Sequence, residues 1–272
     1  CWTASKAECS AARDLLLPHS PSLLEAAAQT AGIRMSVLVE IDVGSRRCGV
    51  PAGEEAVELA KRIASSRHLA FAGLQAYHGA AQHLRSAVER REAIGKAIAG
   101  CERTVEGLSR ARIPCGIVSG AGTGTFELEA ASGVYTELQA GSYCFMDGDY
   151  AANLQEDGQP FRTFRHSLFV LASVMSTARP GLAVLDAGHK AVAIERGLPT
   201  VWQQPELQIL SAADEHARME YPAGRATPEM GERLRLIPGH CDPTVDRFDW
   251  YVCVRAGRVE SVWPITARGG MQ

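Results

Sequence analysis

The chain has 272 residues, with 28 lysines and arginines against 31 aspartates and glutamates, so its formal net charge is −3. Its 46% hydrophobic residues can bury a sizeable core, whereas 22% charged residues offer neither a basic stripe for nucleic acid nor a polybasic membrane anchor. The longest apolar stretches, such as 166–176, are far shorter than the ~20 residues that span a bilayer, so we expect a soluble protein.

Apolar strands alternate with helical patterns through the first half of the chain. Ser22 to Met35 is Ala-rich and predicts a helix that is capped by Ser20 or Ser22 and ends near Gly32. The elements that follow are strands at Val37–Val43, Leu69–Tyr77, Cys115–Ser119 and near Thr136–Ser142, with helices at Glu54–Ser65, from about Ala81 to Ala111, and at Thr125–Ala131. Four apolar strands separated by helices indicate an α/β fold with a parallel sheet or barrel.

After Asp149 the helical periods give way to short strand patterns. These lie at 165–176, 181–186, 191–194, 206–211, 233–237, 249–255 and 258–265. The polar segment 151–160 carries Gly and Pro and is typical of a boundary. We therefore predict an α/β domain over 1–150 and a mainly antiparallel β domain over 151–272.

Eight cysteines stand at irregular positions and form neither a CxxC pair nor a small-domain disulfide framework. We interpret them as reduced thiols of a cytoplasmic protein. The absence of a basic leader with a long apolar stretch favours the same location. The first residue is Cys1, not Met, so processing or truncation of the natural chain remains open.

The segment Gly120–Thr125 (GAGTGT) follows an apolar strand and precedes a helical pattern. Such a turn places backbone N–H groups and two hydroxyls where they can bind a phosphate, although it can also be a simple turn. It matches neither GxGxxG nor a Walker loop, so a nucleotide is not the first choice.

Two other strand ends carry polar side chains. Gln75–His83 (QAYHGAAQH) brings a phenol, two imidazoles and two amides to one strand end, where barrel enzymes place their chemistry. The alternative is that His78 caps a helix and His83 is solvated. In Ile41–Val50, we interpret Arg46 as a surface charge and Arg47 as the side chain that points into the site.

The strongest metal signal is Gly239–Thr244 (GHCDPT). In an extended backbone, His240 and Asp242 lie on the same face and can chelate a divalent ion. The carboxylate favours Mn or Mg over Zn. The segments 214–216 (DEH) and 186–190 (DAGHK) add further acids and bases, with ordinary turns as the alternative interpretation.

Long stretches of the chain resemble one enzyme family. They are VLVEIDVG with RCGV (37–50), GLQAYHG with QH (73–83), GAGTGTFELEAASGVYTELQAGSY (120–143), FMD (145–147), DAGHKA (186–191), DEH (214–216), PGHCDPTVDRFDWYV (238–252) and WPITARGG (263–270). Together they resemble the D-threonine aldolase and 3-hydroxy-D-aspartate aldolase family, pyridoxal-phosphate enzymes of the alanine racemase-like class. The resemblance covers about residues 22–270 and implies a partial (β/α)8 barrel over 1–150, followed by the β domain.

The resemblance implies roles for the residues noted above. The cofactor phosphate would be bound by Gly122, Thr123, Gly124 and Tyr143, and the cofactor ring would be surrounded by Arg47, Tyr77 and Gln75. The metal would be bound by His240 and Asp242. The general base would be His83, and the catalytic set would also include Arg47 and Tyr77. The implied reaction is retro-aldol cleavage of a D-3-hydroxy amino acid to glycine and an aldehyde. Dehydration of D-serine or 3-hydroxyaspartate is the alternative.

One expected element is missing. Members of this fold hold the cofactor through a lysine in a stretch resembling RPHxKTHK, upstream of the VLVEIDVG strand, whereas this chain has lysine only at 6, 61, 96 and 190. We therefore expect three or four of the eight barrel strands to be absent from this sequence. A homodimer is expected once the chain is completed, and an inactive cofactor-binding fragment is the third hypothesis.

Overall fold

The computed structural model describes residues 14–15 and 20–269, so Lys6, Cys1 and Cys9 lie outside the described part. The chain divides into two compact units. The parallel unit runs up to Gly141 and includes Asn153–Pro160, and the antiparallel unit comprises Ser142–Ala152 and the residues from Phe161 onward. The predicted boundary between an α/β domain over 1–150 and a β domain over 151–272 stays a prediction, because compact units are not shown to fold independently.

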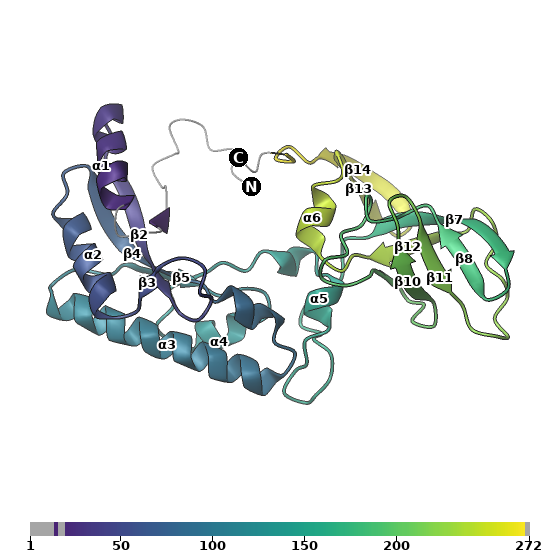
Figure 1. Cartoon of the computed structure of the whole chain (residues 1–272), viewed down its shortest axis with the longest axis horizontal. Helices are drawn as coiled ribbons and strands as arrows, with labels where there is room; N and C mark the ends of the chain where they lie inside the picture. The colour runs from purple at the N-terminus through teal and green to yellow at the C-terminus, as the bar shows by residue number, and fades with distance from the viewer. Residues whose placement is uncertain (1–13, 16–19, 270–272) are drawn as a thin grey trace. The chain divides into compact units, whose positions relative to one another are not determined.

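The parallel unit is built on one sheet whose strand pairs are all parallel. Its order is β1 (Asp14–Leu15), β2 (Met35–Asp42), β4 (Leu69–Ala76), β5 (Ile117–Gly120) and β6 (Glu137–Leu138), with β3 (Val50–Pro51) paired to β2. Its helices are α1 (Ser20–Ala31), α2 (Glu54–Ala64), α3 (Ala87–Arg110) and α4 (Phe126–Ala131). Because neighbouring strands are consecutive along the chain, their carboxyl ends share one edge of the sheet (Figure 1).

Helix α2 shows why these elements form. Its apolar residues recur at helical spacing, and Val57, Leu59 and Ile63 are buried in the same core as Val37 and Leu74 of the sheet. The helix packs on β2, β4 and α3. Glu54 and Glu55 in its first turn and Lys61 and Arg62 in its last complement the helix dipole.

The long predicted helix from Ala81 is wrong at its start. Residues Gly79–His83 form a short 3-10 helix, η1, and Leu84 then adopts an extended conformation. Helix α3 begins only at Ala87, because the Ser86 hydroxyl accepts a hydrogen bond from the Glu89 N–H and caps it. The break sets η1 apart at the strand end, where the polar residues of the site lie.

The antiparallel unit contains a six-stranded sheet in the order β10-β11-β8-β7-β12-β9, in which every strand pair is antiparallel. The strands are β7 (Val170–Arg179), β8 (Leu182–Leu185), β9 (Thr200–Val201), β10 (Gln208–Ala212), β11 (Ala217–Glu220) and β12 (Arg233–Ile237). A separate hairpin is formed by β13 (Trp250–Arg255) and β14 (Arg258–Pro264), and the short helices are η2 (Ser142–Cys144), α5 (Gly148–Ala151) and α6 (Cys241–Val245). The predicted fold class, α/β followed by mainly antiparallel β, is confirmed.

One predicted strand in this unit is wrong, and two strands were not predicted. Residues 191–194 form turns and irregular chain, although Val192 and Ala193 are buried. Their apolar character therefore reflects packing. Strand β9 was missed because its 2 residues are too few to show an alternation, and β11 was missed although its 4 residues alternate between buried and exposed. Within the part of the chain that the structure describes, no helix is long and apolar enough to cross a membrane.

Candidate functional site

The Gly-rich loop lies between β5 and α4, at the carboxyl edge of the parallel sheet. The Thr123 hydroxyl is buried and has no hydrogen-bond partner. Among the described residues, the N–H groups of Gly122 and Thr123 also have no partner, whereas the N–H groups of Thr125 and Phe126 both donate to the Gly122 carbonyl. The loop therefore presents hydrogen-bond donors that have no acceptor in the protein, and it contains no basic side chain.

Gln82 holds this loop from η1. Its side chain is completely buried, its Oε1 accepts the Gly124 N–H at 3.0 Å, and its Nε2 donates to the Thr125 hydroxyl at 2.8 Å. The sequence analysis did not single out Gln82, because nothing in the local pattern shows that residues more than 40 positions apart meet here.

The structure brings Arg47 and Tyr77 together, since the Arg47 guanidinium carbon lies 5.9 Å from the centre of the Tyr77 ring. The Ser45 hydroxyl donates to the Tyr77 carbonyl at 3.3 Å and accepts the Gly79 N–H at 2.8 Å, which ties the ends of β2 and β4. Gln75 is buried on β4 and exchanges two amide hydrogen bonds with Gln139, of 2.8 and 3.0 Å. Gln75 thus has both ends of its amide engaged by a neighbouring strand end.

The two histidines of this edge differ. His78 is buried with its Nδ1 unpartnered, and burial lowers its pKa while the nearby Asp42 carboxylate opposes that shift. His83 is the last residue of η1 and is half-buried. Its predicted role as general base stays a prediction.

The described lysines do not lie at strand ends. Lys61 is on the exposed side of α2 and pairs with Glu58 at 2.6 Å, and Lys96 is exposed on α3. Lys190, in the antiparallel unit, pairs with Glu215 at 2.5 Å. These three side chains are surface ion-pair or solvated residues.

The loop fits the phosphate of pyridoxal phosphate. A phosphate dianion accepts hydrogen bonds and donates few, which matches the unpaired hydroxyl and N–H groups of Gly122 and Thr123. Helix α4 has only 6 residues, so the loop donors and not the helix dipole would carry the binding.

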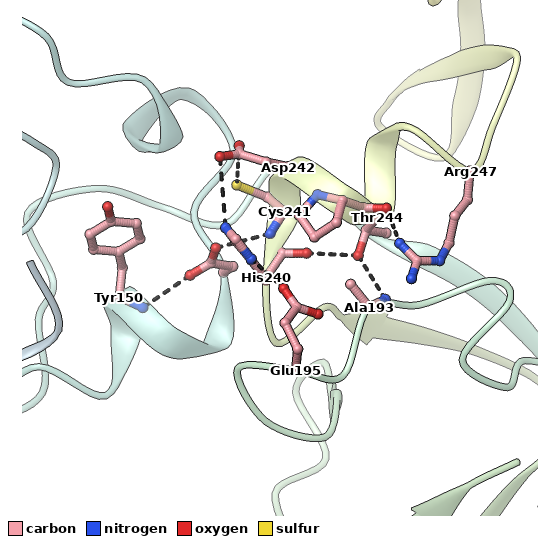
Figure 2. Close-up of polar contacts among 10 residues, drawn as sticks. Tyr150, Ala193, Glu195, His240, Cys241, Asp242, Thr244 and Arg247 are labelled. Carbon is pink, nitrogen blue, oxygen red and sulfur yellow. Dashed lines mark hydrogen bonds and ion pairs between the residues drawn. The ribbon is translucent and has the colours of Figure 1, made fainter. Parts of the chain in front are cut away.

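In the antiparallel unit, His240 lies between two carboxylates (Figure 2). Its Nδ1 is 2.5 Å from Oε1 of Glu195, and its Nε2 is 3.7 Å from Oδ2 of Asp242. The extended backbone predicted for 239–244 is wrong beyond His240, because α6 begins at Cys241. The pair converges because His240 is the extended N-cap residue and Asp242 lies in the first turn of α6.

Glu195 was missed by the sequence analysis. Its carboxylate engages Nδ1 of His240, so the ring proton lies on Nδ1 and the Nε2 lone pair faces Asp242 when the imidazole is neutral. In the absence of a metal, the carboxylates of Asp242 and Glu195 raise the pKa of His240 to about 9, although burial opposes them. A bound cation would have to displace that proton.

The loop before α6 is fixed by a buried acid. The carboxylate of Asp147 accepts the Cys241 N–H at 3.0 Å with one oxygen and the Tyr150 N–H at 3.0 Å with the other. The Thr244 hydroxyl donates to the His240 carbonyl at 2.7 Å and accepts the Ala193 N–H at 3.0 Å (Figure 2). These bonds hold the His240 backbone from both sides.

The pair can accommodate a divalent ion, since two ligand bonds of about 2.1 Å span an N···O separation of 3.7 Å. Among the described residues, no group of three or more His, Cys, Asp or Glu side chains is arranged to hold a metal. The remaining ligands would therefore be water or substrate.

The other predicted residues of this unit contact partners of their own. Tyr143 is 46% exposed in η2 and its ring packs 5.3 Å from that of Phe164, so its contact with the phosphate stays a prediction. Asp214 accepts a hydrogen bond of 2.9 Å from His189 and pairs with Lys190, which makes the DEH and DAGHK segments one exposed ion-pair cluster. All six described cysteines are free thiols.

Comparisons with known proteins agree with this architecture. Residues 8–149 match the alanine racemase N-terminal domain, and residues 167–254 match a putative serine dehydratase domain. A crystal structure of D-threonine aldolase from Filomicrobium marinum superposes with a TM-score of 0.91 at 39% identity, over 96% of this chain and 71% of that one. The two units thus define a protein of the alanine racemase-like class, with the parallel sheet as part of its barrel.

Proteins similar in sequence show which family of the alanine racemase-like class the chain belongs to. The chain is 45% identical over 248 residues to 3-hydroxy-D-aspartate aldolase of Paracoccus denitrificans and 45% identical over 251 residues to D-threonine aldolase of an Arthrobacter species. These matches cover 90% and 92% of the chain but 64% and 65% of the relatives' own lengths. A D-threo-3-hydroxyaspartate dehydratase of a Delftia species is 26% identical over 257 residues. The chain belongs to the D-threonine aldolase and 3-hydroxy-D-aspartate aldolase family.

Proposed function

We propose that the residues of the Gly-rich loop and of the His240–Asp242 pair belong to the active site of a lyase. This lyase depends on pyridoxal phosphate and a divalent metal and cleaves D-3-hydroxy amino acids into glycine and an aldehyde. The observation that carries the proposal is the 45% identity to two such aldolases over nine-tenths of the chain, against 26% to the dehydratase. Substrates of the D-threonine or 3-hydroxyaspartate type are both compatible with this proposal.

In this proposal the parallel unit binds the cofactor. The Thr123 hydroxyl and the N–H groups of Gly122 and Thr123 hold the phosphate, while Arg47 and Tyr77 form a stacked wall beside the ring. Bound pyridoxal phosphate supplies an electron sink for the bond that breaks at the amino acid Cα. Tyr143, of the antiparallel unit, is proposed as a further phosphate donor.

The antiparallel unit contributes the metal pair. His240 Nε2 and Asp242 Oδ2 are proposed to bind Mn or Mg, and Zn less well because one ligand is a carboxylate. A divalent ion at that position lowers the pKa of a hydroxyl bound to it. His83 is proposed to accept the proton of the substrate β-hydroxyl on its imidazole, the step that lets the β-carbon leave as an aldehyde.

Product analysis tests this proposal. A polypeptide that also supplies the lysine is incubated with D-threonine or 3-hydroxy-D-aspartate, pyridoxal phosphate and Mn, and the expected products are glycine and an aldehyde. Ammonia and a keto acid would instead establish the dehydratase, which the match of residues 167–254 to a serine dehydratase domain keeps as the second candidate.

Covalent attachment of the cofactor needs a lysine, and the described lysines are exposed side chains on outer surfaces or in ion pairs. We propose that residues 1–272 alone bind the cofactor without a covalent bond and without turnover. Turnover is then a property of a polypeptide that supplies the lysine, and a homodimer is proposed for it. Borohydride reduction and peptide mapping test this, and a stoichiometric adduct on any of the four lysines, Lys6, Lys61, Lys96 or Lys190, with turnover would contradict it.

A further inference from the structure

We infer that Gln82 is the positioning residue of the phosphate-binding loop. Its buried amide fixes the loop so that the donors of Gly122 and Thr123 stay unpaired for a phosphate ester. The inference rests on the proposed function, because it assumes that the loop binds the cofactor phosphate.

The first argument is the completeness of the Gln82 contacts. Oε1 accepts the Gly124 N–H at 3.0 Å, and Nε2 donates to the Thr125 hydroxyl at 2.8 Å and to the His78 carbonyl at 3.3 Å. The amide cannot be reversed, since Nε2 would then face the Gly124 N–H and Oε1 would face the His78 carbonyl. The neighbours of Gln82 therefore specify one orientation of its side chain.

The second argument is that the loop is shaped around Gln82. A Cβ at position 122 would lie 2.5 Å from Gln82 Oε1, and a Cβ at position 124 would lie 2.7 Å from the Gln82 carbonyl oxygen. Neither distance is possible for a real side chain. Gly122 is thus required by the Gln82 amide in its observed position, and Gly124 by the backbone carbonyl of residue 82.

The third argument is how the loop donors are divided. Gln82 engages the Gly124 N–H, and the Gly122 carbonyl engages the N–H groups of Thr125 and Phe126. The N–H groups of Gly122 and Thr123 and the buried Thr123 hydroxyl stay without a partner among the described residues. Unpaired buried donors cost free energy in a protein without ligand, and an anion that accepts from them recovers it.

Gln82 is itself held from behind. Asn153 donates from Nδ2 to the Gln82 carbonyl at 2.9 Å, and its Oδ1 accepts a hydrogen bond of 2.8 Å from Arg85. The Thr125 hydroxyl, which accepts from Gln82, donates in turn to Oε1 of Glu129 at 2.9 Å. The loop therefore rests on a continuous row of hydrogen bonds from residues far apart in the sequence.

The test compares two probes, pyridoxamine 5′-phosphate and pyridoxamine, whose binding is measured by equilibrium dialysis. Neither needs a reactive lysine, and they differ only in the phosphate. We expect Gln82→Leu to weaken binding of the phosphate probe at least tenfold while pyridoxamine binding changes less than about twofold. Gln82→Glu keeps an acceptor for Gly124 but loses the donors and adds a negative charge. It should therefore lower the affinity for pyridoxamine 5′-phosphate relative to that for pyridoxamine even further.

Thr104→Val is the matched control. Thr104 is completely buried in the same unit and makes two hydrogen bonds of 2.8 Å, to the Gly53 N–H and the Gly100 carbonyl, neither in the loop. This variant should lower the melting temperature and leave the affinity ratio unchanged. Should Gln82→Leu fail to fold, Gln82→Met, an uncharged side chain of similar length that lacks the amide, carries the test, because the charge of Gln82→Glu repels a phosphate by itself.

The outcomes separate the two proposals. If the wild-type protein binds both probes equally, the proposed cofactor site is wrong and the inference falls with it. If the wild-type protein prefers the phosphate probe but both Gln82 variants keep that preference, the inference alone is wrong. An equal loss of preference in Thr104→Val would also overturn it, because general destabilisation would then explain the effect.

Discussion

Glu129 offers a test of the hydrogen-bonded row behind the Gly-rich loop through the pH dependence of stability. Its side chain is 1% exposed, Oε1 accepts from the Thr125 hydroxyl, and Oε2 is buried without a partner. Burial raises the pKa of this carboxyl from 4.5 to about 7, although the hydrogen bond from Thr125 opposes the shift. Burial also raises the pKa values of Cys101 and Tyr135, on which the Glu129 carboxylate acts electrostatically, so both groups are neutral over this pH range.

The direction of the effect follows from proton linkage. The folded protein keeps the Glu129 proton to a higher pH than the unfolded chain does, so protonation favours folding below pH 4.5. That contribution is lost as pH rises from 4.5 to about 7, and it is constant above pH 7. At about 1.4 kcal/mol per pH unit, the loss amounts to about 2 to 3 kcal/mol between pH 5 and pH 8.

Glu129→Gln removes this titration and keeps the side-chain shape and the acceptor for Thr125. The free energy of unfolding, measured by urea denaturation at pH 5 to 8 without added cofactor, should fall for the wild-type protein relative to the variant by that amount. The difference between the two proteins removes the contributions of all other groups. Parallel pH profiles, or a wild-type protein that gains stability over the variant with rising pH, would refute the reasoning.

Three further predictions concern the metal pair and the sheet. His240→Ala or Asp242→Ala, introduced into a polypeptide that also supplies the lysine, should abolish metal-dependent turnover and leave the cofactor absorbance intact, and loss of both together would contradict the assignment. After chelation, Mn or Mg should restore activity at least as well as Zn, and Asp242→Cys should shift the preference toward Zn; strict dependence on Zn in the unmodified protein would argue against this. Gly73→Ala should destabilise the fold by about 3 kcal/mol or more in urea denaturation, because the new Cβ would lie 1.9 Å from the Ile117 carbonyl oxygen at a φ of +155°. Gly95→Ala, on the exposed side of α3 with nothing within 4 Å, is the control and should stabilise by about 1 kcal/mol.

The sequence by itself determined the fold class and the strands after which the candidate site residues lie. Runs such as Val37–Val43 and Leu69–Tyr77 are apolar throughout, as in strands covered on both faces, and they became β2 and β4. Because parallel strands end at one edge, Arg47 and Tyr77, which follow β2 and β4, lie at the same edge, and the structure shows that they meet there. Such patterns are local, with periods of two to four residues, and can be read without the structure.

The tertiary structure decided the contacts that give these residues their environment. The sequence marked Gln82 only as one of several polar residues at a strand end, and it gave no signal for Glu195. Their partners are remote: Thr125 lies 43 positions from Gln82, and His240 lies 45 positions from Glu195. The convergence of His240 and Asp242 depends on a helix start at Cys241 that the extended pattern did not predict, and Asp147, distant in the chain, stabilises that start through the Cys241 N–H. A polar side chain becomes buried and oriented only when partners from remote segments replace its water, and no window of neighbouring residues contains those partners.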